Sequence, residues 1–321
     1  MMPRREERGA ALLSVLLLVA VMAVIAATAL DRLTLATRIA ASAAAVDQGR
    51  AYVLAAEQVA LRRVAGRAGK GLDRDVRLPL PGGEGWARLA DAGHCFNLNS
   101  LAVETAPGRL TQRPGAVAQF TQLMVLLGID GSEAAAIAGA AADWIDSDGI
   151  EGPMGAEDGV YRAMTPAYLP ANRAMADVSE LRAVRGVTPN VLARLKPWIC
   201  ALPTTDPVRL NVDTLAPGQA VLVAMLLPGQ ISVADARAAL AARPAGGYGS
   251  GTRFWQSRSL ARLHPPGDVA AQADVTSRWL ALTTRVTMGD GDLTAVSLID
   301  AGIGAEGAAP AVVRRDWGEA D

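Results

Sequence analysis

Residues 8–30 read RGAALLSVLLLVAVMAVIAATAL, and this stretch decides how the rest of the chain is organised. The 21 residues from Ala10 to Leu30 carry no charge. A helix of that length is about 31 Å long at 1.5 Å per residue, and the hydrocarbon core of a bilayer is about 30 Å thick. The stretch therefore predicts a membrane-spanning helix.

The charges that flank this helix predict its orientation. Arg4, Arg5 and Arg8 precede it, so the positive-inside rule keeps the N-terminus in the cytoplasm and sends the chain after Leu30 across the membrane. A cleavable signal peptide is the alternative, since Ala27-Thr28-Ala29 offers a cleavage site of the A-x-A type. The apolar stretch is longer than the 7–15 residues usual for a signal peptide.

The helical pattern continues beyond the membrane. Residues 31–67 contain no proline, and their apolar residues are set among charged ones. This arrangement predicts one long helix that is apolar all round at first and amphipathic afterwards.

A short basic leader that ends in Gly9 and runs directly into an apolar helix resembles type IV pilins and pseudopilins. The resemblance implies cleavage by the prepilin peptidase between Gly9 and Ala10, followed by N-methylation of Ala10. The chain departs from the pattern at the fifth mature residue, where most members carry Glu and this chain has Ser14.

The rest of the chain changes from strand patterns to helix patterns and back. Short strands are expected at Val76–Leu80 and Trp86–Leu89. Helical patterns follow at Val117–Leu127, at Glu133–Ile145 with Ser132 as its N-cap, in a helix-turn-helix over Glu180–Trp198, and in a second pair from Leu210 to about Arg243. Strands return at Trp279–Met288 and Leu293–Ile299, around the turn Gly289–Asp292, and at Val312–Trp317. This order predicts an α+β domain with an all-helical insertion.

A series of short motifs resembles the K-type minor pseudopilin of the type II (general) secretion pathway, in the order found in that family. They are Phe96–Asn99, Asp143–Asp148, Gly155–Asp158, Tyr168–Asn172, Val178–Leu181 with Val184–Gly186, and Leu210–Thr214. Each motif is weak alone, but together with the leader they are specific. The lack of Glu at position 14 is also what the K-type subunit looks like.

The resemblance implies a fold, a place and a set of partners. The fold is a long pilin-like N-terminal helix with a small antiparallel β-sheet and a large all-α insertion. The expected segments are a leader at 1–9, the transmembrane helix at 10–30, a pilin-like half at 31–98, the insertion at 99–265 and C-terminal strands at 266–321. The protein would be a non-enzymatic, single-pass protein of the bacterial inner membrane with most of its chain in the periplasm.

In that interpretation the subunit caps the tip of the periplasmic pseudopilus together with the I- and J-type minor pseudopilins and supports export of folded proteins across the outer membrane. Its further partners would be the major pseudopilin, the prepilin peptidase and the inner-membrane assembly platform. A minor pilin of a type IV pilus-like machine is the alternative. A third hypothesis is a secreted calcium-dependent hydrolase or a DNA-uptake factor.

An acidic loop is the strongest chemical feature. Six carboxylates lie within residues 143–158, with Arg162 the nearest cation in sequence. Asp146 and Asp148 resemble the start of a calcium loop, and Glu157 is twelfth from Asp146, although Glu151 occupies the position where an EF-hand needs Gly. Mutual repulsion favours a hard divalent cation; a solvated acidic loop is the alternative. K-type relatives bind calcium in the helical domain, which implies Ca²⁺ held by Asp146, Asp148, Glu157, Asp158 and the Ile150 carbonyl, with Asn172 as a weaker candidate.

Cys95 and Cys200 are the only cysteines. Because everything after Leu30 should face the oxidising periplasm, we expect a Cys95–Cys200 disulfide at the base of the insertion. Two buried free thiols are the alternative.

Composition and motifs argue against two other classes. Thirty-one basic and 32 acidic residues give a net charge of −1, which is unlike a nucleic-acid-binding protein. Residues 181–189 imitate a helix-hairpin-helix DNA-binding turn, but Pro189 removes a backbone donor that such a turn needs. No Gly-x-Ser-x-Gly hydrolase motif occurs. We therefore expect neither DNA binding nor enzymatic activity.

Overall fold

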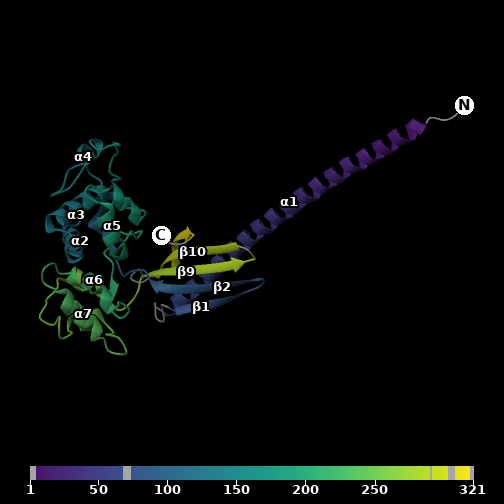
Figure 1. Ribbon diagram of the computed structural model, residues 1–321. Helices are drawn as coiled ribbons and strands as arrows, with labels where there is room; N and C mark the ends of the chain where they lie inside the picture. The colour runs from purple at the N-terminus through teal and green to yellow at the C-terminus, as the bar shows by residue number, and fades with distance from the viewer. Residues whose placement is uncertain (1–4, 68–73, 290, 303–307, 319–321) are drawn as a thin grey trace.

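A computed structural model describes residues 5–67, 74–289, 291–302 and 308–318. A long helix, a five-stranded sheet packed on its second half, and a helical domain at the far end of the sheet follow one another (Figure 1). Residues 1–4 of the expected leader, part of the Gly-rich segment after the helix (68–73) and Asp290 of the expected turn lie outside the described residues.

The N-terminal helix α1 runs unbroken over Arg5–Arg67, as the sequence predicts. Large apolar side chains from Leu12 to Ile39 are at least half exposed. Farther on, the helix buries Val53, Ala60 and Val64 against the sheet. In the part of the chain that the structure describes, α1 alone is long and apolar enough to cross a membrane. One end is thus suited to lipid and the other to a protein core.

The sheet is antiparallel throughout, and its strand order is β1-β2-β9-β10-β11. Alternate side chains of β9 face α1 and are buried, because successive residues of a strand point to opposite faces. The expected strands and the hairpin near residue 290 are confirmed, with wider bounds. The strands are β1 (Arg74–Leu80), β2 (Gly83–Asp91), β9 (Trp279–Met288), β10 (Gly291–Asp300) and β11 (Ala311–Trp317).

A buried ion pair joins α1 to the last strand. Glu57 is 2% exposed, and its two carboxylate oxygens each accept a hydrogen bond of 2.6 Å from the Arg315 guanidinium in β11. Ser297 in β10 donates a third bond, also of 2.6 Å. The charge of Glu57 is therefore neutralised and its oxygens are satisfied, which a buried carboxylate requires.

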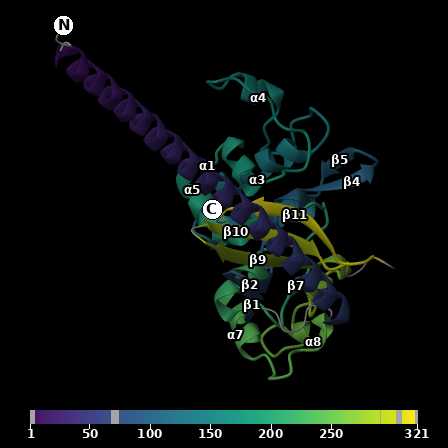
Figure 2. The ribbon, with the colours of Figure 1, turned by 90° about the vertical axis from the view of Figure 1, so that its right-hand side faces the viewer.

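The helical domain lies at the end of the sheet opposite the free part of α1, with α3 and α4 on one side of it and α6 and α7 on the other (Figures 1 and 2). Its core is one continuous apolar cluster that includes Phe120, Ile137 and Leu222. Its helices are α2 (Pro114–Leu126), α3 (Gly131–Ile145), α4 (Asp158–Arg162), α5 (Pro189–Leu195), α6 (Ala220–Ala224), α7 (Val233–Ala241), α8 (Gly251–Trp255) and α9 (Gly267–Ala270). Short 3₁₀ turns are η1 (Leu98–Leu101), η2 (Val178–Ala183), η3 (Lys196–Trp198) and η4 (Pro217–Gln219).

Several local details differ from the sequence expectations. The N-cap of α3 is Asp130, not Ser132, because its carboxylate accepts the backbone N–H of Ser132 at 2.8 Å. The expected helix-turn-helix over Glu180–Trp198 contains the 3₁₀ turn η2 and the short α5. The domain also holds short strands: β4 (Ala102–Ala106) with β5 (Arg109–Gln112), β3 (Phe96–Asn97) with β6 (Ile199–Cys200), and β7 (Leu210–Asn211) with β8 (Ala273–Asp274).

The disulfide predicted from the compartment is confirmed. Cys95 and Cys200 are bonded, with their Cα atoms 5.8 Å apart, so the alternative of two free thiols is wrong. The bond lies beside the β3–β6 pair, where the chain enters the helical domain. On the return side, β8 pairs with β7, so the chain rejoins the sheet at β9 and not at residue 266, the expected boundary.

A candidate metal centre in the acidic loop

The acidic loop connects α3 to α4. Asp146 ends α3, and its N–H still donates to the carbonyl of Ala142 at 3.0 Å. Glu157 is the N-cap residue of α4, although its side chain forms no capping bond. The helix ends thus hold Asp146 and Glu157 at the two ends of one loop.

Asp143 shapes the interior of this loop. Its side chain is fully buried and accepts the backbone N–H of Ala156 at 2.6 Å and that of Gly152 at 3.2 Å. Gln112 of β5 donates to it as well. Burial raises the pKa of Asp143, and these donors work against the rise. Asp143 therefore folds the loop back over α3 with its own hydrogen bonds.

Three aromatic rings fix α4 beside α3. Trp144 meets Tyr161 edge-to-face with ring centroids 5.3 Å apart, and Tyr168 lies 5.4 Å from Tyr161. The hydroxyl of the fully buried Tyr161 accepts the backbone N–H of Arg185 at 3.3 Å. Since α4 has only five residues, this packing positions Glu157.

The loop brings three carboxylates together. One oxygen from each of Asp146, Asp148 and Glu157 lies within 4.8 Å of the others. Calcium–oxygen distances are about 2.3–2.6 Å, so oxygens on opposite sides of such an ion lie up to about 5 Å apart. The cluster has the dimensions of a divalent cation site.

These carboxylates are also short of partners. Asp146 is 2% exposed and Glu157 is 5% exposed. Among the described residues, Oδ1 of Asp146 and both carboxylate oxygens of Glu157 have no hydrogen-bond donor. Desolvation, followed by the charges of neighbouring carboxylates, raises the pKa of Asp146 to about 7 and that of Glu157 to about 7. Buried carboxylates without donors are costly unless a cation completes them.

The donor set fits a hard cation. Carboxylate and carbonyl oxygens suit calcium or magnesium, whereas nitrogen and sulfur ligands would suit zinc. A divalent ion bound here would supply the missing positive charge and tie the end of α3 to the start of α4.

The remaining predicted ligands are not among the three carboxylates that the loop brings together. The carboxylate of Asp158 pairs with Arg162 at 2.7 Å. Ile150 donates its N–H to Asp148 at 2.9 Å, and its side chain is exposed. Asn172 has a positive φ of 46° and is held by its N–H on the carbonyl of Trp144. Their part in binding a metal stays a prediction.

The structure also places the predicted cleavage site and the segment that resembles a DNA-binding turn. Gly9 and Ala10 both lie within α1. Gly186, in the imitation turn, has a φ of +85°, and a Cβ there would come 3.1 Å from Ile137 of α3. That turn thus packs against the core of the domain.

Sequence reasoning missed the distinct task of Asp143 and the pairing of Glu57. Asp143 was counted with the other acidic residues, although two glycines that follow it, Gly152 and Gly155, leave no room for a Cβ beside its carboxylate. That glycine spacing was the available signal. Glu57 and Arg315 are too far apart in sequence for any local pattern to connect them.

Two family models, both described as type II secretion system protein K, match residues 94–204 and 210–276. The type II secretion system protein K of Pectobacterium carotovorum subsp. carotovorum is 32% identical over 98% of both chains. The chain belongs to the type II secretion system protein K family. This membership favours the secretion interpretation over a type IV pilus.

Other relatives support the same family membership. Protein K of Aeromonas hydrophila is 35% identical over 76% of this chain and 78% of its own. A solved structure, the GspK–GspI–GspJ complex from the type II secretion system of enterotoxigenic Escherichia coli, has a chain of 30% identity. It superimposes with a TM-score of 0.69 over 85% of this chain and 97% of that one. The long helix, the antiparallel sheet and the helical domain are thus those of a protein K.

Proposed function

We propose that this protein is a minor pseudopilin that caps the tip of a type II secretion pseudopilus, in complex with the I- and J-type minor pseudopilins. The observation that carries the proposal is the match to a chain solved in a GspK–GspI–GspJ complex. In this role the protein supports the export of folded proteins and performs no chemistry of its own.

Two features of the chain favour the tip over the shaft. Stacked pilin-like subunits need a negative charge at the fifth mature residue to neutralise the terminal amine of the subunit above, because an unpaired buried charge is costly. Ser14 carries no such charge. The helical domain lies beyond the end of the sheet farthest from the membrane helix (Figure 1), and we expect it to obstruct a further subunit there.

Gold labelling of the full-length protein in isolated pseudopili tests this position. We expect one label at one end of each filament. Labels repeated along the shaft contradict the proposal. Ser14→Glu should increase incorporation into the shaft only if the helical domain is not the main obstruction, so the variant separates the two causes.

The membrane placement is part of the same proposal. We infer that the prepilin peptidase cleaves between Gly9 and Ala10, that Ala10 is methylated, and that α1 anchors the protein in the inner membrane with the sheet and helical domain in the periplasm. The apolar length of α1 and the arginines before it support this placement. N-terminal sequencing should find methyl-alanine; a first residue after Ala29 contradicts it.

We also propose that the acidic loop holds Ca²⁺ through Asp146, Asp148 and Glu157, with Asp158, the Ile150 carbonyl and Asn172 as further candidates. The unpartnered oxygens of Asp146 and Glu157 support it. Calorimetric titration of the metal-free full-length protein should show binding that Asp146→Asn abolishes and that Glu151→Gln, an exposed acid of the same loop, leaves unchanged. Asp158→Asn then decides whether that residue is a ligand. Equal binding by wild type and Asp146→Asn contradicts the site.

A further inference from the structure

The helical domain joins the sheet through two short, adjacent segments of chain. Residues 92–95 lead from the end of β2 into the domain, and residues 275–278 lead back to β9 (Figure 1). The two segments lie side by side, because the backbone N–H of Ala92 donates to the carbonyl of Trp279 at 2.9 Å. Such a pair of connections has the geometry of a hinge, since a few residues at element ends can absorb a rotation of one body against the other.

The apolar cores on the two sides of this joint are largely separate. The core of the helical domain takes its buried residues from residues 95–273 and, from the sheet, Trp279 and Leu298. The core between α1 and the sheet consists of two other clusters. Two bodies move against each other by default unless their interface is large and hydrophobic. The angle between the helical domain and the sheet therefore needs another cause.

A buried carboxylate occupies the joint. The side chain of Asp91, at the end of β2, is 5% exposed. Its Oδ2 accepts hydrogen bonds from the hydroxyl of Ser277, in the returning segment, and from that of Thr214, in the helical domain, at 3.1 Å. His94 Nε2 lies 3.2 Å from the same oxygen and 3.0 Å from Thr214 Oγ1. One carboxylate thus holds the sheet, both connecting segments and the helical domain together.

The chemistry around Asp91 strengthens these bonds. Burial by itself would raise the pKa of Asp91, but the hydrogen bond and charge of His94, followed by the hydroxyl of Ser277, hold that pKa below its ordinary value. Asp91 is therefore ionised, and hydrogen bonds to an ionised acceptor are about twice as strong as neutral ones. Asn211 donates to Ser277 at 2.8 Å, so the motif Leu210–Thr214 contacts the joint at two points.

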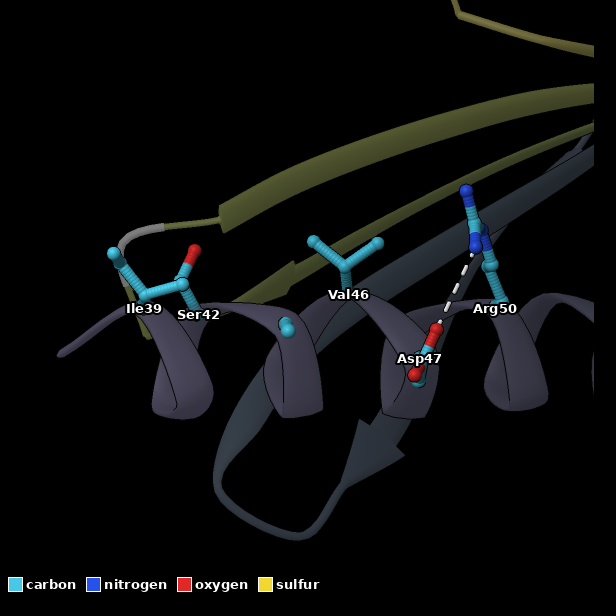
Figure 3. A pocket seen from close by; sticks show the side chains of 6 residues that line it. Ile39, Ser42, Val46, Asp47 and Arg50 are labelled. Carbon is cyan, nitrogen blue, oxygen red and sulfur yellow. Dashed lines mark hydrogen bonds and ion pairs between the residues drawn. The ribbon is translucent and has the colours of Figure 1, made fainter. Parts of the chain in front are cut away.

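Other contacts across the joint lie at its surface. Arg278 pairs with Asp206 of the helical domain at 3.5 Å, and the Asp206 side chain is 68% exposed. The exposed Arg314 of β11 donates to two backbone carbonyls of the domain at 3.2 and 3.4 Å. Figure 3 shows a surface pair of the same kind, Asp47 with Arg50 on the flank of α1. Water and salt screen such pairs, so they fix little by themselves.

We propose that the Asp91 carboxylate is a latch that sets the angle of the helical domain to the sheet. When the latch is closed, Thr214 and Ser277 hold the domain at one angle. When it is open, the domain swings as a rigid body about residues 92–95 and 275–278. The bonds of one carboxylate can break without exposing either apolar core, so the swing requires no unfolding. This inference concerns the chain by itself and does not depend on the proposed tip complex.

Double electron–electron resonance on the full-length protein in lipid nanodiscs tests the latch. Spin labels attached through p-acetylphenylalanine at Thr287 of β9 and Ala241 of α7, both exposed, leave the native disulfide untouched. Asp91→Asn has the same size but cannot accept all of these hydrogen bonds, and we expect it to at least double the width of the distance distribution. The control Asp213→Asn removes a carboxylate that accepts the N–H of Tyr248 inside the helical domain at 2.7 Å, and it should leave the width unchanged.

A second label pair inside the helical domain, at Glu133 and Ala241, distinguishes a swinging domain from a loosened one. Its distance should stay as narrow in Asp91→Asn as in the wild type, and broadening of this pair as well overturns the proposal. Thr214→Val removes the hydroxyl on the domain side and should also broaden the sheet-to-domain distance. This variant decides the matter if Asp91→Asn does not fold. A wild-type width in the folded variant overturns the latch.

Discussion

Glu57 and Glu157 are both buried, with 2% and 5% of their surfaces exposed, but their surroundings are opposite. Arg315 and Ser297 supply three hydrogen bonds to Glu57. Glu157 has no donor among the described residues, and the charges that act on it most are those of other carboxylates, Asp143, Asp146 and Asp148. Glu57 is thus neutralised by its own chain, whereas neutralising Glu157 would take a positive charge from outside the described residues.

The difference separates scaffold from binding site. A carboxylate neutralised by an arginine of the same chain joins α1 to β11 without an added ion. For the unpartnered cluster we expect instead that protons or metal ions from solution determine how firmly α3 and α4 are joined.

Arg315→Ala should have the largest effect, because it leaves Glu57 buried and unpaired, as Glu157 is. Breaking a buried pair costs about 3–5 kcal/mol. Glu57→Ala should cost less, since the remaining Arg315 side chain is 29% exposed and reaches water. Urea unfolding of both variants measures the costs. Equal losses of unfolding free energy in the two variants would show that leaving Glu57 unpaired costs no more than leaving Arg315 unpaired.

Calcium should stabilise the helical domain by about 2.7 kcal/mol at a hundredfold excess over its Kd, because the proposed site exists only in the folded loop. The double variant Asp146→Asn with Glu157→Gln should lose this gain and be more stable than the wild type in chelator, since its buried charges are gone. Thermal melts with calcium and with chelator report both effects. If neither calcium nor chelator changes the melting temperature of the wild type, the contrast drawn between Glu57 and Glu157 is wrong.

Without calcium, stability should fall as the pH rises. The pKa values of Asp146 and Glu157 are raised to about 7 in the folded protein, whereas the unfolded chain releases these protons near pH 4. The folded state thus holds more protons between about pH 4 and 7, and raising the pH through this window disfavours folding.

Calcium binding should strengthen over the same window, because the metal needs the ionised carboxylates. Unfolding midpoints measured from pH 4.5 to 8 in chelator test the trend, with the double variant as a flat control. A wild-type midpoint that rises with pH in chelator contradicts it.

The smallest effect is expected at Asp47. Its pair with Arg50 is exposed on both sides, and such pairs contribute about 0.2–1 kcal/mol at most. Asp47→Ala should therefore change the unfolding free energy by less than about 0.5 kcal/mol. If Asp47→Ala lowers the unfolding free energy as much as Glu57→Ala does, burial does not explain the difference expected between the two pairs.

The sequence predicted the elements whose signal is local. The uncharged run from Ala10 to Leu30, the alternation in Trp279–Met288 and the crowding of carboxylates after Asp143 can each be recognised from adjacent residues. The role of Asp143 and the Glu57–Arg315 pair could not be predicted, because each depends on a fold that brings distant backbone or side-chain groups together. Short helices such as η2 were overestimated, since tertiary packing and not helix propensity decides them.

The disulfide also sets the route by which tension crosses the molecule. A pull between α1 and the α6–α7 side of the helical domain passes along β2 to Cys95, crosses the sulfur bridge to Cys200, and continues from there. Residues 96–199, which include α3 and the acidic loop, lie outside this path. An extended chain spans about 3.3–3.6 Å per residue. Under force, the reduced protein could therefore extend by roughly 350 Å more than the oxidised protein.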